Sequence, residues 1–123
     1  MIVMAPISVG ELIDKITILS IKAERITDPK KQLNVSNELI KLKEIESSLK
    51  IPNIQELYKQ LYFVNSELWY IEDSKRQCEK DRNFGPMFIE YARNVYIKND
   101  ERAKIKNEIN KLVGSSIVEE KSY

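Results

Sequence analysis

The sequence predicts an all-α fold, an elongated bundle of four main helices with extended N- and C-terminal segments. Apolar residues recur at alternating steps of three and four along most of the chain, which is the spacing of one helix face. Turn-forming residues interrupt this pattern near Pro29, near Pro52 and at Gly85-Pro86. Because the break at 50–52 is short, we expect the helices on either side of it to form an antiparallel hairpin.

The first helix is expected to start after Ser8, whose hydroxyl would form a capping box with Glu11. Its apolar seam consists of Val9, Leu12, Ile16, Leu19, Ala23 and Ile26. Ile13 and Ile21 widen this seam, so more than one neighbour is expected to cover the helix.

Asp28 and Pro29 suit the N-cap and first position of a second helix, which would run to about Leu49. Its predicted seam is Val35, Leu39, Leu42 and Leu49. A second capping box, Asn53 with Glu56, would open a third helix. Its seam is Ile54, Leu57, Leu61, Val64, Leu68, Ile71 and Cys78. If it is helical to residue 81, this helix is ~42 Å long, which favours an elongated shape.

A strong turn at 83–86 precedes the fourth helix. Its predicted seam is Phe88, Ala92, Val95, Ile105, Ile109 and Leu112. Asn99 and Arg102 interrupt that seam and Asp100 could cap a fresh start, so a kink there is one alternative. Gly114 is a natural helix C-terminus, and residues 115–123 are expected to be extended.

Composition limits the chemistry of this chain. Its 123 residues are typical of one domain, and we expect residues 1–123 to form a single helical-bundle domain. The absence of histidine excludes a Ser–His–Asp triad and an imidazole base. The single cysteine, Cys78, excludes an internal disulfide and a thiolate metal cage. We therefore expect no metal and no cofactor.

The charges and the apolar runs bear on partners and location. The 20 basic and 19 acidic residues are spread along the whole chain and form no basic stripe, so we expect no nucleic-acid partner. No apolar run approaches the ~20 residues that a membrane span needs. The N-terminus lacks the features of a secretory signal. A cytoplasmic location and no membrane association are expected.

Four stretches resemble an uncharacterised bacterial DUF family. They are GELIDKITIL with KAERI at 10–19 and 22–26, LWYIED at 68–73, ARNVYIKNDERA at 92–103, and VEEKSY at 118–123. The resemblance extends over nearly the full chain and implies a single helical domain. The family has no assigned activity, so the resemblance implies no catalytic residue.

One candidate chemistry rests on carboxylates. Glu11 and Asp14 lie three residues apart on one helix face, and Glu72 and Asp73 lie on another helix. All-α nucleotide pyrophosphatases use acidic pairs on two helices to hold magnesium, which prefers oxygen ligands. However, adjacent side chains diverge by about 100° on a helix, and Glu72 can instead pair with Arg76. Metal-dependent nucleotide hydrolysis therefore stays an alternative.

A second candidate rests on the cations Lys15, Lys22, Arg25, Arg76, Arg93 and Arg102. The first helix resembles the opening helix of helical chorismate mutases in its Leu-Ile-Asp-Lys-Ile stretch, which implies a dicarboxylate held between arginines and lysines. Those enzymes carry an arginine near the start of that helix, whereas residues 8–10 here are Ser-Val-Gly. These long side chains could equally lie over apolar surface with their charged heads in water.

Arg102 on an apolar seam needs a buried partner, because an unpaired buried charge is costly. Asp14, Glu72 and Asp73 are the candidates, and we favour a structural role for such a network. The polar residues that an enzyme could use are Asp14, Lys15, Lys22, Glu72, Asp73, Arg93 and Arg102.

Aromatic residues cluster on the third helix, mostly away from its apolar seam. They are Tyr58, Tyr62, Phe63, Trp69 and Tyr70. A second apolar face on a long helix indicates either burial in a central position or a surface for a partner. We therefore expect a non-enzymatic interaction or assembly module that forms a homo-oligomer, with a dimer favoured. The alternative is a small-molecule enzyme of either type above.

Overall fold

The computed structural model describes residues 1–117 and 119–122, and within this part of the chain it has four α-helices and no strand. Helix α1 covers Val9–Arg25, α2 Pro29–Ser48, α3 Gln55–Lys80 and α4 Pro86–Val113. This confirms the predicted all-α bundle of four helices.

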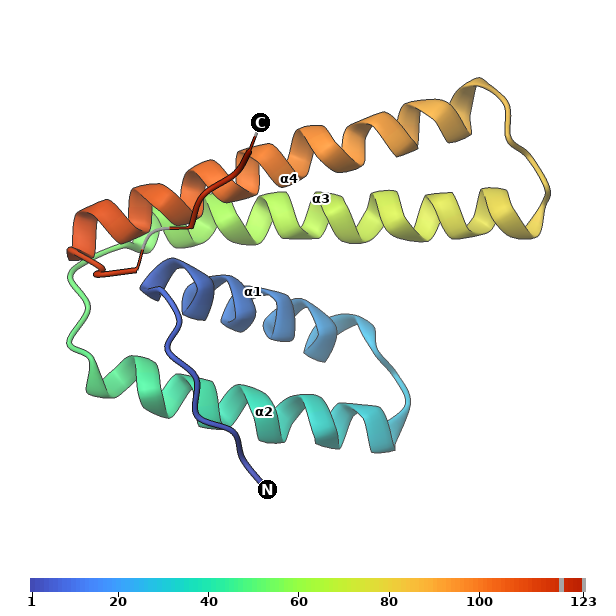
Figure 1. Cartoon of the computed structure of the whole chain (residues 1–123). Coiled ribbons are helices and arrows are strands. Elements are labelled where there is room, and N and C mark those ends of the chain that lie inside the picture. Colours follow the sequence, from blue (N-terminus) through green and yellow to red (C-terminus); the bar gives the residue numbers. More distant parts are fainter. Residues whose placement is uncertain (118, 123) are drawn as a thin grey trace.

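The helices form three layers (Figure 1). Helices α3 and α4 make a long antiparallel hairpin, α1 packs against one side of it, and α2 covers the opposite side of α1. Helix α2 contacts α1 and neither of the other two helices. The predicted antiparallel hairpin across residues 50–52 is therefore wrong, because α1 lies between α2 and α3. Because α1 has 17 residues against 26 and 28 in α3 and α4, the tip of the hairpin extends beyond it.

The helix starts follow the predicted caps at two of three places. The Ser8 hydroxyl accepts a hydrogen bond from the Glu11 amide at 3.0 Å, and Asp28 accepts one from the Lys31 amide at 3.0 Å. The predicted Asn53 cap of α3 is wrong. The helix starts at Gln55, one residue later than predicted. Asn53 Oδ1 instead accepts a hydrogen bond from the Gln55 amide at 3.0 Å, in a local turn.

Helix α1 is the centre of the molecule. Its apolar residues Leu12, Ile13, Ile16, Leu19 and Ile21 are all buried, because three helices surround it. This confirms that its wide apolar surface needs several neighbours. In contrast, α2 buries only Val35, and Leu49, which we predicted in its seam, is 48% exposed.

The α3–α4 hairpin has a regular apolar interface. Leu61, Val64, Leu68, Ile71 and Cys78 are buried on α3 as predicted, and Ile105 and Ile109 are buried on α4.

The predicted α4 seam needs two corrections. Ala92 is exposed and Leu112 is 54% exposed, whereas Tyr91 and Val113 are half-buried. The three-four repeat continues through Tyr91, Val95 and Arg102 once polar residues are allowed in it, which the apolar pattern alone did not reveal. Helix α4 is also continuous through residues 99–100, so it does not break there.

Both terminal segments lie outside the helices. Residues 1–7 are exposed and carry no helix or strand. Helix α4 ends at Gly114, whose φ of 67° is the left-handed conformation that glycine adopts without cost. The described residues of the predicted extended tail also carry no helix or strand, and Val118 and Tyr123 of that tail lie outside the described residues.

Candidate functional site

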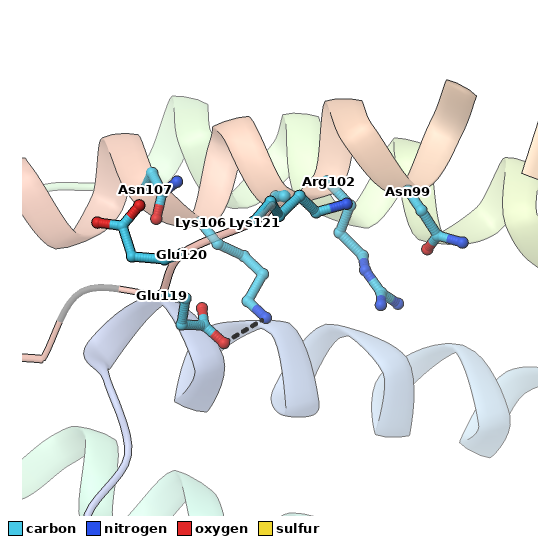
Figure 2. Close-up of a pocket in the computed structure, with 8 residues that line it drawn as sticks. Asn99, Arg102, Lys106, Asn107, Glu119, Glu120 and Lys121 are labelled. Carbon is cyan, nitrogen blue, oxygen red and sulfur yellow. Dashed lines mark hydrogen bonds and ion pairs between the residues drawn. The ribbon is translucent and has the colours of Figure 1, made fainter. Parts of the chain in front are cut away.

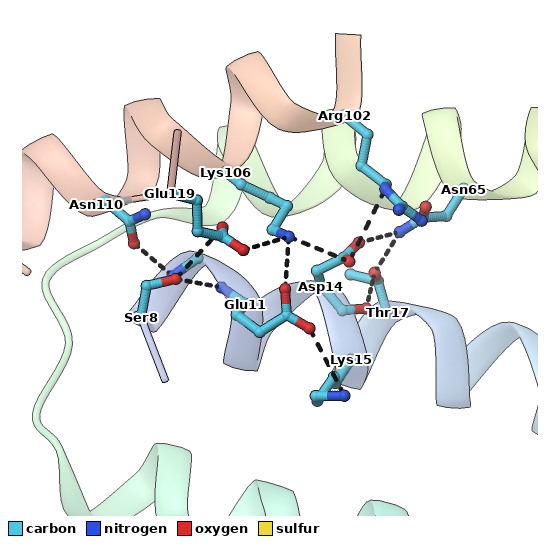
Figure 3. Close-up of polar contacts among 11 residues, drawn as sticks. Ser8, Glu11, Asp14, Lys15, Thr17, Asn65, Arg102, Lys106, Asn110 and Glu119 are labelled. Carbon is cyan, nitrogen blue, oxygen red and sulfur yellow. Dashed lines mark hydrogen bonds and ion pairs between the residues drawn. The ribbon is translucent and has the colours of Figure 1, made fainter. Parts of the chain in front are cut away.

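Polar side chains from α1, α3, α4 and the C-terminal tail meet where the tail crosses the α1–α4 interface (Figure 3). We call this group the α1–α4 polar cluster. It consists of Ser8, Glu11, Asp14, Thr17, Asn65, Arg102, Lys106, Asn110 and Glu119. Charged side chains of α1, α4 and the tail thus contact one another at a junction of several elements.

Lys106 is the centre of the cluster. Its Nζ lies 2.5 Å from Glu11 Oε2, 3.2 Å from Glu119 Oε1 and 3.9 Å from Asp14 Oδ2. The side chain is only 11% exposed, so water does little to stabilise the ammonium group. The three carboxylates take over that role, and they tie α4 to α1 and to the tail.

Asp14 is held from three directions. Its side chain is 5% exposed, and Oδ1 accepts a hydrogen bond from Asn65 Nδ2 at 2.8 Å. The same amide group donates to Thr17 Oγ1, also at 2.8 Å. Arg102 Nε lies 3.9 Å from Asp14 Oδ2. The carboxylate therefore joins α1 to both helices of the hairpin.

At one end of the cluster, α1 and α4 approach closely at Gly10. Its amide donates a 2.7 Å hydrogen bond to Asn110 Oδ1. A Cβ on residue 10 would lie 2.5 Å from the Lys106 carbonyl oxygen, which real side chains do not tolerate. The lack of a side chain at this position is what permits the contact.

The charges in the cluster stabilise one another. Burial alone would raise the pKa of Glu11, but the hydrogen bond and the charge of Lys106, aided by Lys15, lower it below 4.5. Burial likewise opposes the charge on Lys106, yet the hydrogen bond and charge of Glu11, with Asp14 and Glu119, raise its pKa above 10.5. Both groups are therefore ionised at neutral pH.

A polar cavity of about 350 Å³ lies between the tail and α4 (Figure 2). Arg102 and Asn99 line one side of it, Lys106 and Asn107 the other, and residues 119–121 its outer edge. The Lys106 ammonium reaches Glu119 across this space, as the dashed line in Figure 2 marks. The cationic side chains around the cavity thus already have carboxylate partners from the chain itself.

The structure brings together only part of the predicted polar set. Asp14 is the partner that Arg102 needed, and Lys15 pairs with Glu11 at 3.6 Å. Glu72 lies 3.7 Å from Lys75 rather than beside Arg76, because the side chain turns toward the residue one step nearer.

The other predicted polar residues lie elsewhere. Asp73 and Arg93 are exposed on the hairpin, and Lys22 is half-buried near the end of α1. Among the described residues, no group of three or more acidic or cysteine side chains is arranged to hold a metal ion.

The sequence did not single out five members of the cluster, which are Thr17, Asn65, Lys106, Asn110 and Glu119. Lys106 lies four residues after Arg102, on the same helix face. Once Arg102 was assigned to the interface with a partner, this spacing was the signal that pointed to Lys106. Glu119 gave no such signal, because no periodic pattern covers the tail.

Of the five aromatic residues predicted to form a surface on α3, two are exposed and three are half-buried. Phe63 and Tyr70 are 66% and 62% exposed. Tyr58, Tyr62 and Trp69 are half-buried, and the Tyr62 hydroxyl donates a 2.6 Å hydrogen bond to Glu24 on α1. That bond raises the pKa of Tyr62 to about 12. The two exposed rings lie on α3 where it faces solvent.

Further exposed apolar side chains follow toward the tip of the hairpin. They are Phe84, Met87, Ile89, Tyr96 and Ile97. With Phe63 and Tyr70 they form what we call the hairpin apolar surface. Over the described residues, no helix is long and apolar enough to cross a membrane.

Comparisons with known proteins place the chain in one family. Residues 3–123 match the family DUF6165, described as a family of unknown function. No curated protein matches the chain, and no solved structure matches it. The match extends over nearly the whole length, as the resemblance implied, and the chain therefore belongs to the DUF6165 family.

Proposed function

We propose that this chain is a non-enzymatic helical assembly module that associates with a second copy of itself through the α3–α4 hairpin. The hairpin apolar surface carries the proposal. Seven large apolar or aromatic side chains there are between 37% and 66% exposed, whereas the core of the molecule is well filled without them. Exposed apolar side chains concentrated on one hairpin are typical of interaction sites on soluble proteins.

The chemistry of the α1–α4 polar cluster supports a structural role. An enzyme needs polar groups that converge on an open space and keep some of their charge unpaired. Here Lys106 has three carboxylates within 4 Å, and the Asp14 carboxylate is held by Asn65, Arg102 and Lys106. The charges of the cluster are thus paired within the chain, while Asn110 Nδ2 is buried without a hydrogen-bond partner among the described residues. A network of paired charges suits a device that fixes how α1, α4 and the tail fit together. A cytoplasmic location and a single domain over residues 1–123 complete the proposal.

Light scattering after size exclusion tests the assembly function directly. Over a hundredfold range of protein concentration, the molar mass should rise from that of one chain, 14.4 kDa, toward twice this value. The matched control is a variant with Leu33→Gln and Ile40→Gln, two exposed apolar residues on α2. Its mass should follow the same curve. A constant single-chain mass for the wild-type protein would overturn the proposal.

The alternative is a small-molecule enzyme of the nucleotide-hydrolase or chorismate-mutase type, using the cavity beneath the tail. A thermal-unfolding screen with magnesium, manganese, nucleotides and small dicarboxylates separates the two functions. We expect no shift in melting temperature. A ligand at 100 times its dissociation constant would add about 2.7 kcal/mol of stability, and a shift of that size would favour the enzyme.

A further inference from the structure

We propose that two copies of the chain cross at Ser66, with their α3 helices antiparallel about a two-fold axis. This inference rests on the proposed assembly function and names the surface and geometry of the contact. The surface is a stripe on α3 formed by Lys59, Phe63, Ser66, Tyr70 and Asp73, which we call the α3 outer stripe.

The α3 outer stripe is a single helix face. Its members follow one another at steps of four, three, four and three residues, the spacing that keeps side chains in line along an α-helix. It points away from α1, because Phe63 lies two residues, or about 200°, around the helix from Asn65, and Asn65 donates hydrogen bonds to α1. Phe63 and Tyr70 are accordingly about two thirds exposed.

The middle of the stripe suits a close helix crossing. Ser66 has a small side chain and lies between the two large rings, so a second helix could approach there with a ring on either side. Phe63, Ser66 and Tyr70 also line a groove of about 410 Å³ between α3 and α4. At its charged edge, Lys98 pairs with Glu67 at 3.1 Å, so the centre of the surface carries no unpaired charge.

The order of residues along the stripe fixes the direction of the second copy. Lys59 and Asp73 are each seven residues from Ser66, on opposite sides of it. An antiparallel crossing places Lys59 beside Asp73 of the second copy, and it forms this contact twice. A parallel crossing would place like charges together. Among the described residues neither side chain has a hydrogen bond or ion pair of its own, so both are available.

The size of the contact indicates a weak dimer. Each fully buried aromatic side chain contributes roughly 150–250 Å², so two rings that are about two thirds exposed would bring roughly 200–300 Å² per copy. Stable interfaces bury about 800 Å² per partner. The two rings alone fall well short of this value, so we expect a weak dimer whose population depends on protein concentration.

A charge exchange tests the geometry. Lys59→Asp alone and Asp73→Lys alone should each weaken the dimer about tenfold, whereas the double variant should return to within about threefold of the wild type. Phe63→Glu should weaken it at least a hundredfold. The matched control is Leu33→Glu, a replacement of a 61% exposed apolar residue on α2 that lies outside the hairpin apolar surface, and it should leave dimerisation unchanged.

Cross-linking tests the position of the axis. Ser66→Cys should give a disulfide-linked dimer on oxidation, because a residue at the two-fold axis meets its own copy within disulfide distance. Lys41→Cys on the exposed side of α2 should not, and neither should the wild-type protein, whose Cys78 is buried. Circular dichroism should show the same helix content in every variant.

The outcomes separate this inference from the assembly function. A dimer that is insensitive to Phe63→Glu, shows no rescue in the double variant and does not cross-link at residue 66 overturns the α3 geometry and leaves the assembly function standing. A dimer that Ile89→Glu disrupts instead places the contact at the hairpin tip. A protein that is a monomer at every concentration overturns both.

Discussion

Gly10 has no side chain, and α4 uses the space that one would occupy. Its amide bonds to Asn110, and the Lys106 carbonyl oxygen lies where a Cβ would be. Glycine is needed at position 10 because the α4 backbone approaches it closely, and not because its backbone adopts a left-handed conformation. The same closeness allows Lys106 to reach Glu11 across the interface.

Gly10→Ala should therefore destabilise the fold by about 1–3 kcal/mol, the usual cost of forcing extra atoms into a packed interface. Thermal unfolding followed by circular dichroism measures it. The control is Gly85→Ala, where the nearest atom to a new Cβ is the Asn83 side-chain oxygen at 3.4 Å, an ordinary contact. A Gly10→Ala protein that melts at the wild-type temperature would show that α1 and α4 can shift apart freely.

The Glu11–Lys106 pair should make stability depend on pH. The pKa of Glu11 is lowered on folding, so its contribution is present above the ordinary value of 4.5 and is lost as the pH falls through the lower folded-state value. The pKa of Lys106 is raised, so its contribution is present below 10.5 and is lost at still higher pH, as the lysine deprotonates in the folded protein.

Urea unfolding between pH 3 and pH 7 checks the acid side. Glu11→Gln should reduce the slope of stability against pH by up to about 1.4 kcal/mol per unit, the value for one proton. Glu38→Gln, at an exposed position of α2, should leave the slope unchanged. Equal slopes for wild type and Glu11→Gln would mean that the ion pair contributes nothing to folding.

At the residue scale, sequence reasoning reached part of the polar cluster. Arg102 on an apolar seam demanded a buried acid, and Asp14 is that acid. The contact of Lys106 with Glu11 joins residues 95 positions apart. No local spacing predicts such a pairing, because it depends on which helix faces which and on where the tail returns.

Among the elements, α2 stands apart. It buries Val35 alone and contacts only α1, whereas the other helices each contact at least two neighbours. Its apolar residues Leu33, Ile40 and Ile45 remain between 43% and 61% exposed. Helix propensity and a cap at Asp28 can form this helix locally, but little tertiary packing holds it.

Helix α2 should therefore open more readily than the rest of the protein. Native-state hydrogen exchange should show its amides exchanging at least tenfold faster than those of α3 between Leu61 and Ile71, because local opening of α2 exposes little apolar surface. The α3 amides serve as the internal reference. Equal protection in the two helices would mean that α2 unfolds only with the whole molecule.

The helices themselves were predictable. Each has a three-four apolar repeat, and proline or glycine marks the boundaries at Pro29, Pro86 and Gly114. The start of α3 was harder to predict, because an asparagine side chain can either cap a helix or bond to the backbone in a local turn. Asn53 forms the local turn. The continuity of α4 through residues 99–100 was also open, because the partner of Arg102, Asp14, lies on another helix and no local pattern identifies it.

At the scale of the whole molecule, the sequence predicted a four-helix bundle but not its layering. An apolar seam indicates that a helix packs against a neighbour, but it does not identify that neighbour. The outer position of α2 and the central position of α1 are therefore seen only in the three-dimensional arrangement. The wide seam of α1, with Ile13 and Ile21, was the one pattern that indicated a central place. The exposure of Phe63 and Tyr70 follows from the same layering, because these side chains lie on the face of α3 that points away from α1.

The return of the chain to its beginning also sets an order of events during synthesis. Gly10 meets Asn110, 100 residues later, and Ser8 meets Glu119, 111 residues later. At about 5–20 residues per second, the ribosome needs roughly 5–20 s to supply those partners. Until then α1 can pair only with α2 and α3, and the face that α4 later covers stays in water. During that interval Glu11 and Asp14 lack Lys106, so the α1–α4 polar cluster can form only near the end of synthesis.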